Sequence, residues 1–295
     1  MKSLALSILF LCLLTHAHAQ VPIIVTNAEQ TMSKGSHTAF SITIPQAQKK
    51  DVDDAWAKAV KQKSKSKAAQ IGNELVIIGT LIPLITTDSL NIYATTVATT
   101  EGVKLDAYFE TKAGFIQADN ASLVLPAQKF VHDFAVSAYK KAVTDELNIE
   151  NEKLQDLEQE LKGLAKEEDK LVADIKKKET QISNIKNDII ANEGDQATKR
   201  NLIQAQKQKV ESAKKVSKDS EAAEVKNLKA LEKELDALIK TNEKLHAKIT
   251  DLETGIRENG REIDTLKQNQ GLKNEAIGVQ KQRVQLVTTK LNGIQ

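Results

Sequence analysis

The chain has 295 residues, with 42 Lys and Arg against 40 Asp and Glu, and aromatic side chains make up only 3% of it. So few rings exclude one large globular core, and the balanced charge makes nucleic acid a poor partner. All aromatic residues and prolines lie at or before position 139, whereas 141–295 holds 29 basic and 29 acidic residues. The second half therefore has the composition of a long helix or coiled coil.

The first nineteen residues have the pattern of a secretory signal peptide. Lys2 precedes an apolar run over 4–14, and Ala17-His18-Ala19 is the small-x-small pattern that signal peptidases cleave, here before Gln20. The run is shorter than the roughly 20 residues of a membrane-spanning helix. Cys12, the only cysteine, lies within this run, so no disulfide is expected after cleavage. We expect an exported protein, periplasmic or extracellular, with no transmembrane span in the mature chain.

An extended leader over 20–32 is expected to precede a small α+β head domain over 33–140. Alternating side chains predict a strand over 37–44, and Asp51 is a candidate N-cap for a helix over 52–60. The apolar stretch 75–85 is interrupted by glycine and proline, which predicts two buried strands that meet at a turn.

The rest of the head is expected to contain more strands and a helix. β-branched and aromatic runs predict strands over 90–98, 103–111 and 115–117. Pro126 suits the first turn of a helix, and residues 130–138 have the spacing of a helix packed on a sheet. The predicted order is strand, helix, several antiparallel strands, helix.

No pattern for catalysis, cofactor binding or metal binding is found, so we expect no enzyme and no cofactor. His37, His132 and His246 form no His-x-x-x-His pair, which argues against a zinc site. One basic cluster could hold phosphate or an acidic glycan, although a Lys run without aromatic or glycine-rich neighbours is more typical of a solvated loop. This candidate anion-binding patch consists of Lys58, Lys61, Lys63, Lys65 and Lys67.

Residues 141–295 contain two runs in which apolar residues alternate at spacings of three and four. The first run spans 143–192 and the second 228–294, and this period of 3.5 predicts a coiled-coil seam, a narrow apolar stripe that another helix must cover. We expect the seam to contain Leu154, Leu157, Leu161, Leu164, Leu171, Ile175, Ile182, Ile185, Ile189, Leu228, Leu231, Leu235, Leu238, Asn242, Leu245, Ile249, Leu252, Ile256, Asn259, Ile263 and Leu266.

Two arrangements can cover this seam, an antiparallel hairpin within one chain or a parallel homo-oligomer. Residues 150–169 carry a net charge of −5 and 267–290 a net charge of +4, so these stretches attract each other in a hairpin. Asn242 in the seam points the other way, because parallel two-stranded coils tolerate such a residue. Charge favours the hairpin, with arms of about 141–215 and 222–295.

The point of reversal has two candidates. Residues 193–227 hold few large apolar side chains, and they separate two seam runs that differ in phase by four residues. Glu193-Gly194-Asp195 and Ser217-Lys218-Asp219-Ser220 could each end one helix and begin the next. A hairpin that turns near 218 has arms of equal length, each roughly 110 Å long at about 1.5 Å per residue.

The head resembles a family of exported proteins of Bacteroidetes-type bacteria that have an N-terminal α+β domain and a C-terminal coiled coil. The resemblance covers roughly 33–215 and depends on Lys34-Gly35, the run Phe40-Ser41-Ile42-Thr43-Ile44-Pro45, Trp56, Asn91-Ile92-Tyr93-Ala94 and 130–134. It implies the fold and export, and no known activity.

Three functions remain open from the sequence. The first is a non-enzymatic cell-envelope protein that acts as spacer, scaffold or assembly partner, with a protein partner bound through the head or the coil. The second is a periplasmic holdase whose helical arms clasp unfolded clients; arm-type chaperones are similar in having a coil and a small β-containing body. In those chaperones both chain ends return to the body, whereas here the C-terminus is expected to end in the coil. The third is a hydrolase with an unrecognised site in the head.

Overall fold

A computed structural model describes residues 23–61 and 68–295. The predicted signal peptide and three lysines of the candidate patch, Lys63, Lys65 and Lys67, lie outside the described residues. The chain divides into two compact units. The first joins Met1–Leu154 with Val279–Gln295, and the second is Gln155–Gly278.

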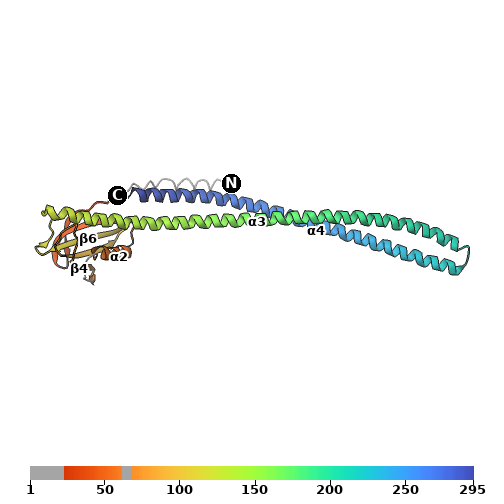
Figure 1. The fold of residues 1–295 in the computed structure, drawn as a ribbon, viewed down its shortest axis with the longest axis horizontal. Coiled ribbons are helices and arrows are strands. Elements are labelled where there is room, and N and C mark those ends of the chain that lie inside the picture. Colours follow the sequence, from red (N-terminus) through yellow and green to blue (C-terminus); the bar gives the residue numbers. More distant parts are fainter. Residues whose placement is uncertain (1–22, 62–67) are drawn as a thin grey trace. The chain divides into compact units, whose positions relative to one another are not determined.

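The first unit contains one antiparallel sheet of seven strands, which confirms the predicted α+β class (Figure 1). The order is β1-β2-β6-β5-β4-β3. Strand β7 pairs with Glu110 and Thr111 at the end of β6, beyond the residues that pair with β2. The strands are β1 (Thr26–Met32), β2 (Gly35–Pro45), β3 (Ala69–Ile71), β4 (Glu74–Thr80), β5 (Leu90–Ala98), β6 (Gly102–Thr111) and β7 (Gly114–Phe115).

Three features of the sheet differ from the expectation, and one is β3, which pairs with β4 and was not predicted. Half of the stretch predicted as an extended leader forms β1, an edge strand paired along its whole length with β2. The prediction of two strands over 75–85 is wrong, because β4 is the only strand there. Gly79 has a φ of +71°, the register shifts between Ile77 and Thr80, and a turn then closes by hydrogen bonds to the Ile82 carbonyl oxygen. Ile82 and Ile85 lie in this turn after β4, and both side chains are buried.

Helix α2 (Lys49–Val60) packs on one face of the sheet. Val52, Trp56 and Val60, spaced by four, are almost completely buried. Asp51 is not the N-cap; the helix begins two residues earlier, after Gln48, and Asp51 lies in its first turn. A carboxylate at that place still interacts favourably with the positive end of the helix dipole.

Helix α3 (Ala121–Ala213) begins on the same face of the sheet as α2. It starts five residues before Pro126, so the expected first-turn position of this proline is wrong. The Trp56 ring lies 4.8 Å from the Phe134 ring and 5.7 Å from the Phe130 ring, and Phe109 of β6 also meets Phe130. The aromatic residues of the first half of the chain thus gather where two helices cover the sheet.

Helix α4 (Lys218–Gly293) runs antiparallel to α3, which confirms the predicted hairpin. Its last turns belong to the first unit, where Val287 and Ile294 are buried in the same core as the sheet and the start of α3. Lys290 forms an ion pair of 2.9 Å with Glu146 and a hydrogen bond with Gln46. The C-terminus therefore completes the head core.

The reversal lies at 214–217, between α3 and α4, and Glu193-Gly194-Asp195 is part of α3. Ser217 is the N-cap of α4, since its hydroxyl accepts a hydrogen bond from the backbone N–H of Ser220. The carbonyl groups of Val210, Ser212 and Ala213 accept hydrogen bonds from the turn, which satisfies the end of α3 without a glycine.

Candidate interaction surfaces

Each of the 21 predicted seam residues is buried or half-buried in the structure. The alternation in α3 does not stop at Asn192. It continues at the same spacing to the end of the helix, so that the change of phase falls at the turn. The added positions are Gln196, Lys199, Ile203, Gln206, Val210 and Ala213; five of them are buried, and Lys199 is half-buried. Their polar side chains hid the pattern in the sequence.

Polar seam residues bond across the hairpin in both units. In the first unit the Gln280 amide donates to the Glu150 carboxylate at 2.6 Å and to its backbone oxygen at 2.8 Å, and both side chains are buried. In the second unit Gln270 donates to Glu168 at 2.8 Å, and Asn259 donates to Asp174 at 2.9 Å. A register slip would leave these groups unpaired, so the polar layers specify which turns of the two helices meet.

Two of these carboxylates have a lowered pKa. For Glu150 the hydrogen bond from Lys153 is the largest cause, followed by that from Gln280, and burial opposes both. For Asp174 the hydrogen bond from Lys178 leads, followed by that from Asn259. Both groups are therefore held in the charged form by partners in the hairpin.

Asn242 has no matching partner. Its Oδ1 atom is buried and accepts no hydrogen bond from the described residues. Asn192 of α3, in contrast, is satisfied within its own helix by the Gln196 amide at 2.7 Å. The hairpin thus holds one seam amide that is satisfied only in part.

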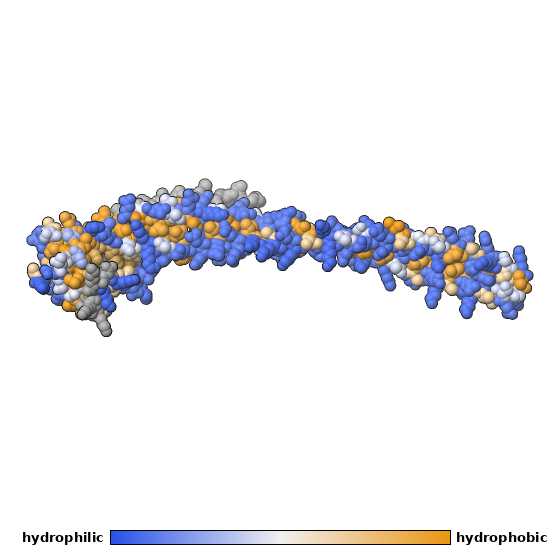
Figure 2. Space-filling view, viewed as in Figure 1, coloured by the Kyte–Doolittle hydropathy of each residue, from blue (hydrophilic) through white to orange (hydrophobic). Residues whose placement is uncertain are grey.

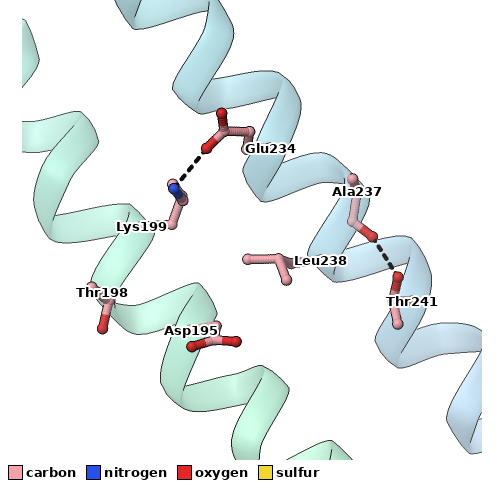
Figure 3. Close-up of a pocket in the computed structure, with 7 residues that line it drawn as sticks. All are labelled: Asp195, Thr198, Lys199, Glu234, Ala237, Leu238 and Thr241. Carbon is pink, nitrogen blue, oxygen red and sulfur yellow. Dashed lines mark hydrogen bonds and ion pairs between the residues drawn. The ribbon is translucent and has the colours of Figure 1, made fainter.

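Two shallow grooves lie between the helices of the second unit. The groove of about 460 Å³ is lined by Asp195, Thr198 and Lys199 of α3 and by Glu234, Ala237, Leu238 and Thr241 of α4 (Figure 3). Lys199 and Glu234 bridge it with an ion pair of 2.6 Å. A second groove of about 650 Å³ lies beside Gly163, whose missing side chain leaves the space open, and Lys273 pairs there with Glu160. Neither lining holds a nucleophile paired with a base.

The outer surface of the hairpin is mostly hydrophilic on the face shown in Figure 2, and its apolar residues form separate patches. The exposed large apolar residues of the helices are far apart in sequence: Leu125, Ile149, Val172, Ile190, Leu202, Leu272 and Leu286, with Val216 at the turn. Single exposed residues of this kind are normal on soluble proteins.

The sheet of the head has a second face, opposite to α2 and α3. We use "second face" for the side chains that point this way, namely Ala39, Ser41, Glu74, Val76, Asn91, Tyr93, Asp106, Tyr108 and Glu110, which the strand register places side by side. Tyr93, Tyr108, Glu74 and Asp106 are each at most 5% exposed. No helix in the described part of the chain contributes to this cluster.

The turn between β1 and β2, residues 32–35, covers the second face. Ser33 donates from its backbone N–H and its hydroxyl to the Glu74 carboxylate, at 2.7 and 2.5 Å. In the sheet, β4 lies three strands from β2, or roughly 14 Å at about 4.8 Å per strand. The turn must therefore arch over β6 and β5 to reach Glu74. We call residues 32–35 the tip.

Lys34 of the tip is bound in a small cage. Its ammonium group lies 5.0 Å from the centre of the Tyr93 ring and 3.2 Å from a Glu110 oxygen. Glu110 also accepts hydrogen bonds from the Tyr93 hydroxyl at 2.8 Å and from the Asn91 amide at 2.9 Å. An aromatic face beside a carboxylate is a common arrangement for binding a cation.

Burial and polar neighbours shift the pKa values of two groups on the second face. Burial raises the pKa of Tyr108 to about 12, and the nearby charges of Asp106 and Glu74 add to this shift. The pKa of Glu110 is lowered: burial acts to raise it, but hydrogen bonds from Asn91, Tyr93 and Lys34 outweigh burial. The face thus carries several acidic groups, and Glu110 is held in its charged form.

The other residues singled out in the sequence are dispersed. Lys58 lies in α2 and Lys61 directly follows it, and both are exposed. His37 stacks on Phe115 at 3.7 Å, whereas His132 lies beside Asp133 in α3 and His246 lies in α4. In residues 23–61 and 68–295 no group of three or more His, Cys, Asp or Glu side chains is placed to hold a metal ion. Within the same residues no helix is both long and apolar enough to cross a membrane.

Comparison with known proteins gives no assignment: no family model matches the chain, and neither does any curated protein. The coarse part of the resemblance, an N-terminal antiparallel sheet domain followed by two long packed helices, is what the structure has.

Proposed function

We propose that this chain is an exported, non-enzymatic protein of the cell envelope that acts as a spacer or assembly scaffold, with the head as its interaction module. The observation that carries this proposal is that the coiled-coil seam is covered within the chain. Because α3 and α4 cover each other's apolar stripes, the seam needs no second copy to cover it, and the face of the hairpin shown in Figure 2 is mostly hydrophilic.

The length and regularity of the second unit support a spacing role. Its part of α3, Gln155–Ala213, measures about 90 Å at 1.5 Å per residue. The polar layers of Gln270 with Glu168 and Asn259 with Asp174 specify the register of the two helices. Export is part of the proposal on the strength of the signal-peptide pattern in residues 1–19.

Matched deletions in the two arms test the spacing role. Removal of 196–202 together with 231–237 takes out one heptad from each helix, including the Lys199–Glu234 pair, and keeps both seams in phase. Cells that carry only chains shortened by one, two or three such layers should show a graded loss of envelope integrity, measured as sensitivity to detergent. A chain lengthened by one heptad in each arm is the control, because its sequence is altered at the same place without shortening the hairpin.

The results distinguish a spacer from other roles. Equal, full function of all shortened chains would contradict a role that depends on length. Loss of function at one particular layer, independent of length, would point instead to a binding site in that layer.

Mass spectrometry tests export separately. The exported chain should have Gln20 as its first residue, and a retained Met1 would contradict export by cleavage.

A holdase is the second candidate, and one observation favours it. The sequence argued against this role because the C-terminus was expected to end in the coil. In the structure Ile294 is 3% exposed in the head core and Lys290 bonds Gln46, so both ends of the hairpin return to the head. The scattered apolar residues of the helices argue against it, since client binding needs a continuous apolar surface.

An aggregation assay separates the two candidates. Residues 20–295 would be mixed at a stoichiometric ratio with an unfolded outer-membrane protein, and light scattering would be followed. A scaffold leaves aggregation unchanged, whereas a holdase suppresses it. Suppression that persists when Leu272 and Leu286, two exposed residues of α4, are both changed to Ser would place the client site elsewhere than on these patches.

A further inference from the structure

The second face of the head has the chemistry of a cation-binding surface. It combines two tyrosine rings with the carboxylates of Glu74, Asp106 and Glu110. Lys104 of β6 pairs with Asp106 on this face at 2.9 Å. Among residues 23–61 and 68–295, the other cation that pairs with this face is Lys34, which comes from the tip.

The contacts that hold the tip in place are mainly polar: Ser33 donates to the buried Glu74 carboxylate, and Lys34 pairs with Glu110 near the surface. The Lys34 side chain is 45% exposed in its ion pair with Glu110, so water screens much of that attraction. Ser33 to Ser36 are all exposed, and Gly35 reverses the chain with a φ of +110°. Met32 is the only tip side chain buried in the apolar cluster. A segment that takes the place of the tip therefore has to replace the hydrogen bonds to Glu74 as well as the ion pair of Lys34.

Departure of the tip would change the charge of this face. Without Lys34, the carboxylates of Glu74, Asp106 and Glu110 keep Lys104 as their one ion-pair partner in the described part of the chain. The same movement frees the cage formed by the Tyr93 ring, the Glu110 carboxylate and the Asn91 amide. An incoming ammonium group would find the geometry that Lys34 now uses.

We propose that the second face binds a lysine-bearing extended segment of a partner protein, and that the tip occupies this site as an internal substitute when no partner is bound. This inference depends on the proposed role of the head as interaction module and names the partner by its chemistry. Charge complementarity selects the occupant: an ammonium group over a tyrosine ring and beside a carboxylate is favourable, whereas an acidic segment would be repelled.

The probe is an acetylated and amidated peptide with the tip's own sequence, residues 31–37. Binding to residues 20–295 would be followed by NMR shifts of the tyrosine ring protons. In Lys34→Ala the internal substitute is missing, so the peptide should bind about ten-fold more tightly than to the unaltered chain, the effect of one ion pair and one cation–π contact. The same peptide with Glu in place of Lys should not bind.

Two further variants control this experiment. Lys49→Ala removes a lysine that pairs with Asp53 on α2, away from the second face, and should bind the peptide like the unaltered chain. Glu110→Gln added to Lys34→Ala removes the carboxylate of the cage and should abolish the gain. Trp56 fluorescence checks that each variant keeps its core.

Equal peptide affinity in Lys34→Ala, Lys49→Ala and the unaltered chain would overturn the proposal, as would equal binding of the Glu peptide. If Lys34→Ala does not fold, Lys34→Met keeps the alkyl stem without the charge and answers the same question. Failure here leaves the spacer role standing, because the heptad deletions test that role in the second unit.

Discussion

The head and the hairpin stabilise themselves by different packing. In the head, aromatic rings from α2, α3 and β6 meet within 4.8 to 6.3 Å around Trp56 and Phe130, and most core residues are almost fully buried. In the hairpin most seam residues are only half-buried, and several of the buried ones are polar. The comparison teaches that a thick core tolerates little loss of volume, whereas a two-helix seam spreads its stability over many weak layers.

The largest effect is expected for a cavity in the head. Phe134→Ala removes the ring that packs against Trp56 and should lower the free energy of unfolding by about 3 kcal/mol. Urea denaturation followed by Trp56 fluorescence measures this loss of stability.

Leu161→Glu places a charge in the seam of the hairpin. It should reduce the helicity measured by circular dichroism and leave the Trp56 fluorescence intact. Loss of both signals together in either variant would show that the two parts do not unfold separately.

A smaller but still large effect is expected at the C-terminus. Ile294→Ala should destabilise the head by about 2 kcal/mol, because this side chain is buried in the head core although it lies directly after the long helix α4. Gln295→Ala, at the exposed neighbouring position, is the matched control and should change nothing. An unchanged urea midpoint in Ile294→Ala would show that the end of α4 does not contribute to the head.

The polar layer at Glu150 and Gln280 should behave as a coupled pair. Glu150→Leu or Gln280→Leu alone leaves a buried partner without its hydrogen bond, at a cost of about 1 to 3 kcal/mol. The double variant forms an apolar layer and should regain most of this loss. A double-mutant cycle in urea measures the coupling, with the exposed Glu152→Leu as control. Purely additive losses would show that the two residues do not act together.

The smallest effect is a pH dependence from the same layer. The pKa of Glu150 is below its ordinary value of 4.5 in the folded chain, so its contribution is complete above pH 4.5 and is lost as the pH falls through the lower, folded value. Glu150→Gln should therefore lose less stability than the unaltered chain on acidification below pH 4.5. Urea midpoints between pH 6 and 3 test this, with Glu152→Gln as the exposed control. Parallel curves for the unaltered chain and Glu150→Gln would contradict it.

The main elements of the fold could be predicted because their signals are local. The period of 3.5 residues marked the helices, and strand β5 was predicted with its observed bounds, 90–98. Edge strand β1 was missed because its alternation is weak and partly polar. The seam beyond Asn192 was missed because Gln196 and Gln206 occupy positions where apolar residues are expected.

The candidate interaction surface could not be predicted from sequence. Ser33 and Glu74, or Lys34 and Glu110, are separated by 41 and 76 residues, and nothing in their local patterns marks them as partners. Only the strand order and the arch of the tip bring them together. A lysine beside a glycine in a turn has no distinctive signal by itself.

The sequence alone determined that this protein has an aromatic-rich α+β head and a long two-helix coil, because composition and periodicity are properties of short windows. The tertiary structure decided where the chain reverses, which polar layers pair, how the tip covers the second face, and that Ile294 returns to the head core. These features depend on contacts between residues far apart in the chain. Local patterns allow several arrangements, and the one with the most favourable burial and pairing free energy is adopted.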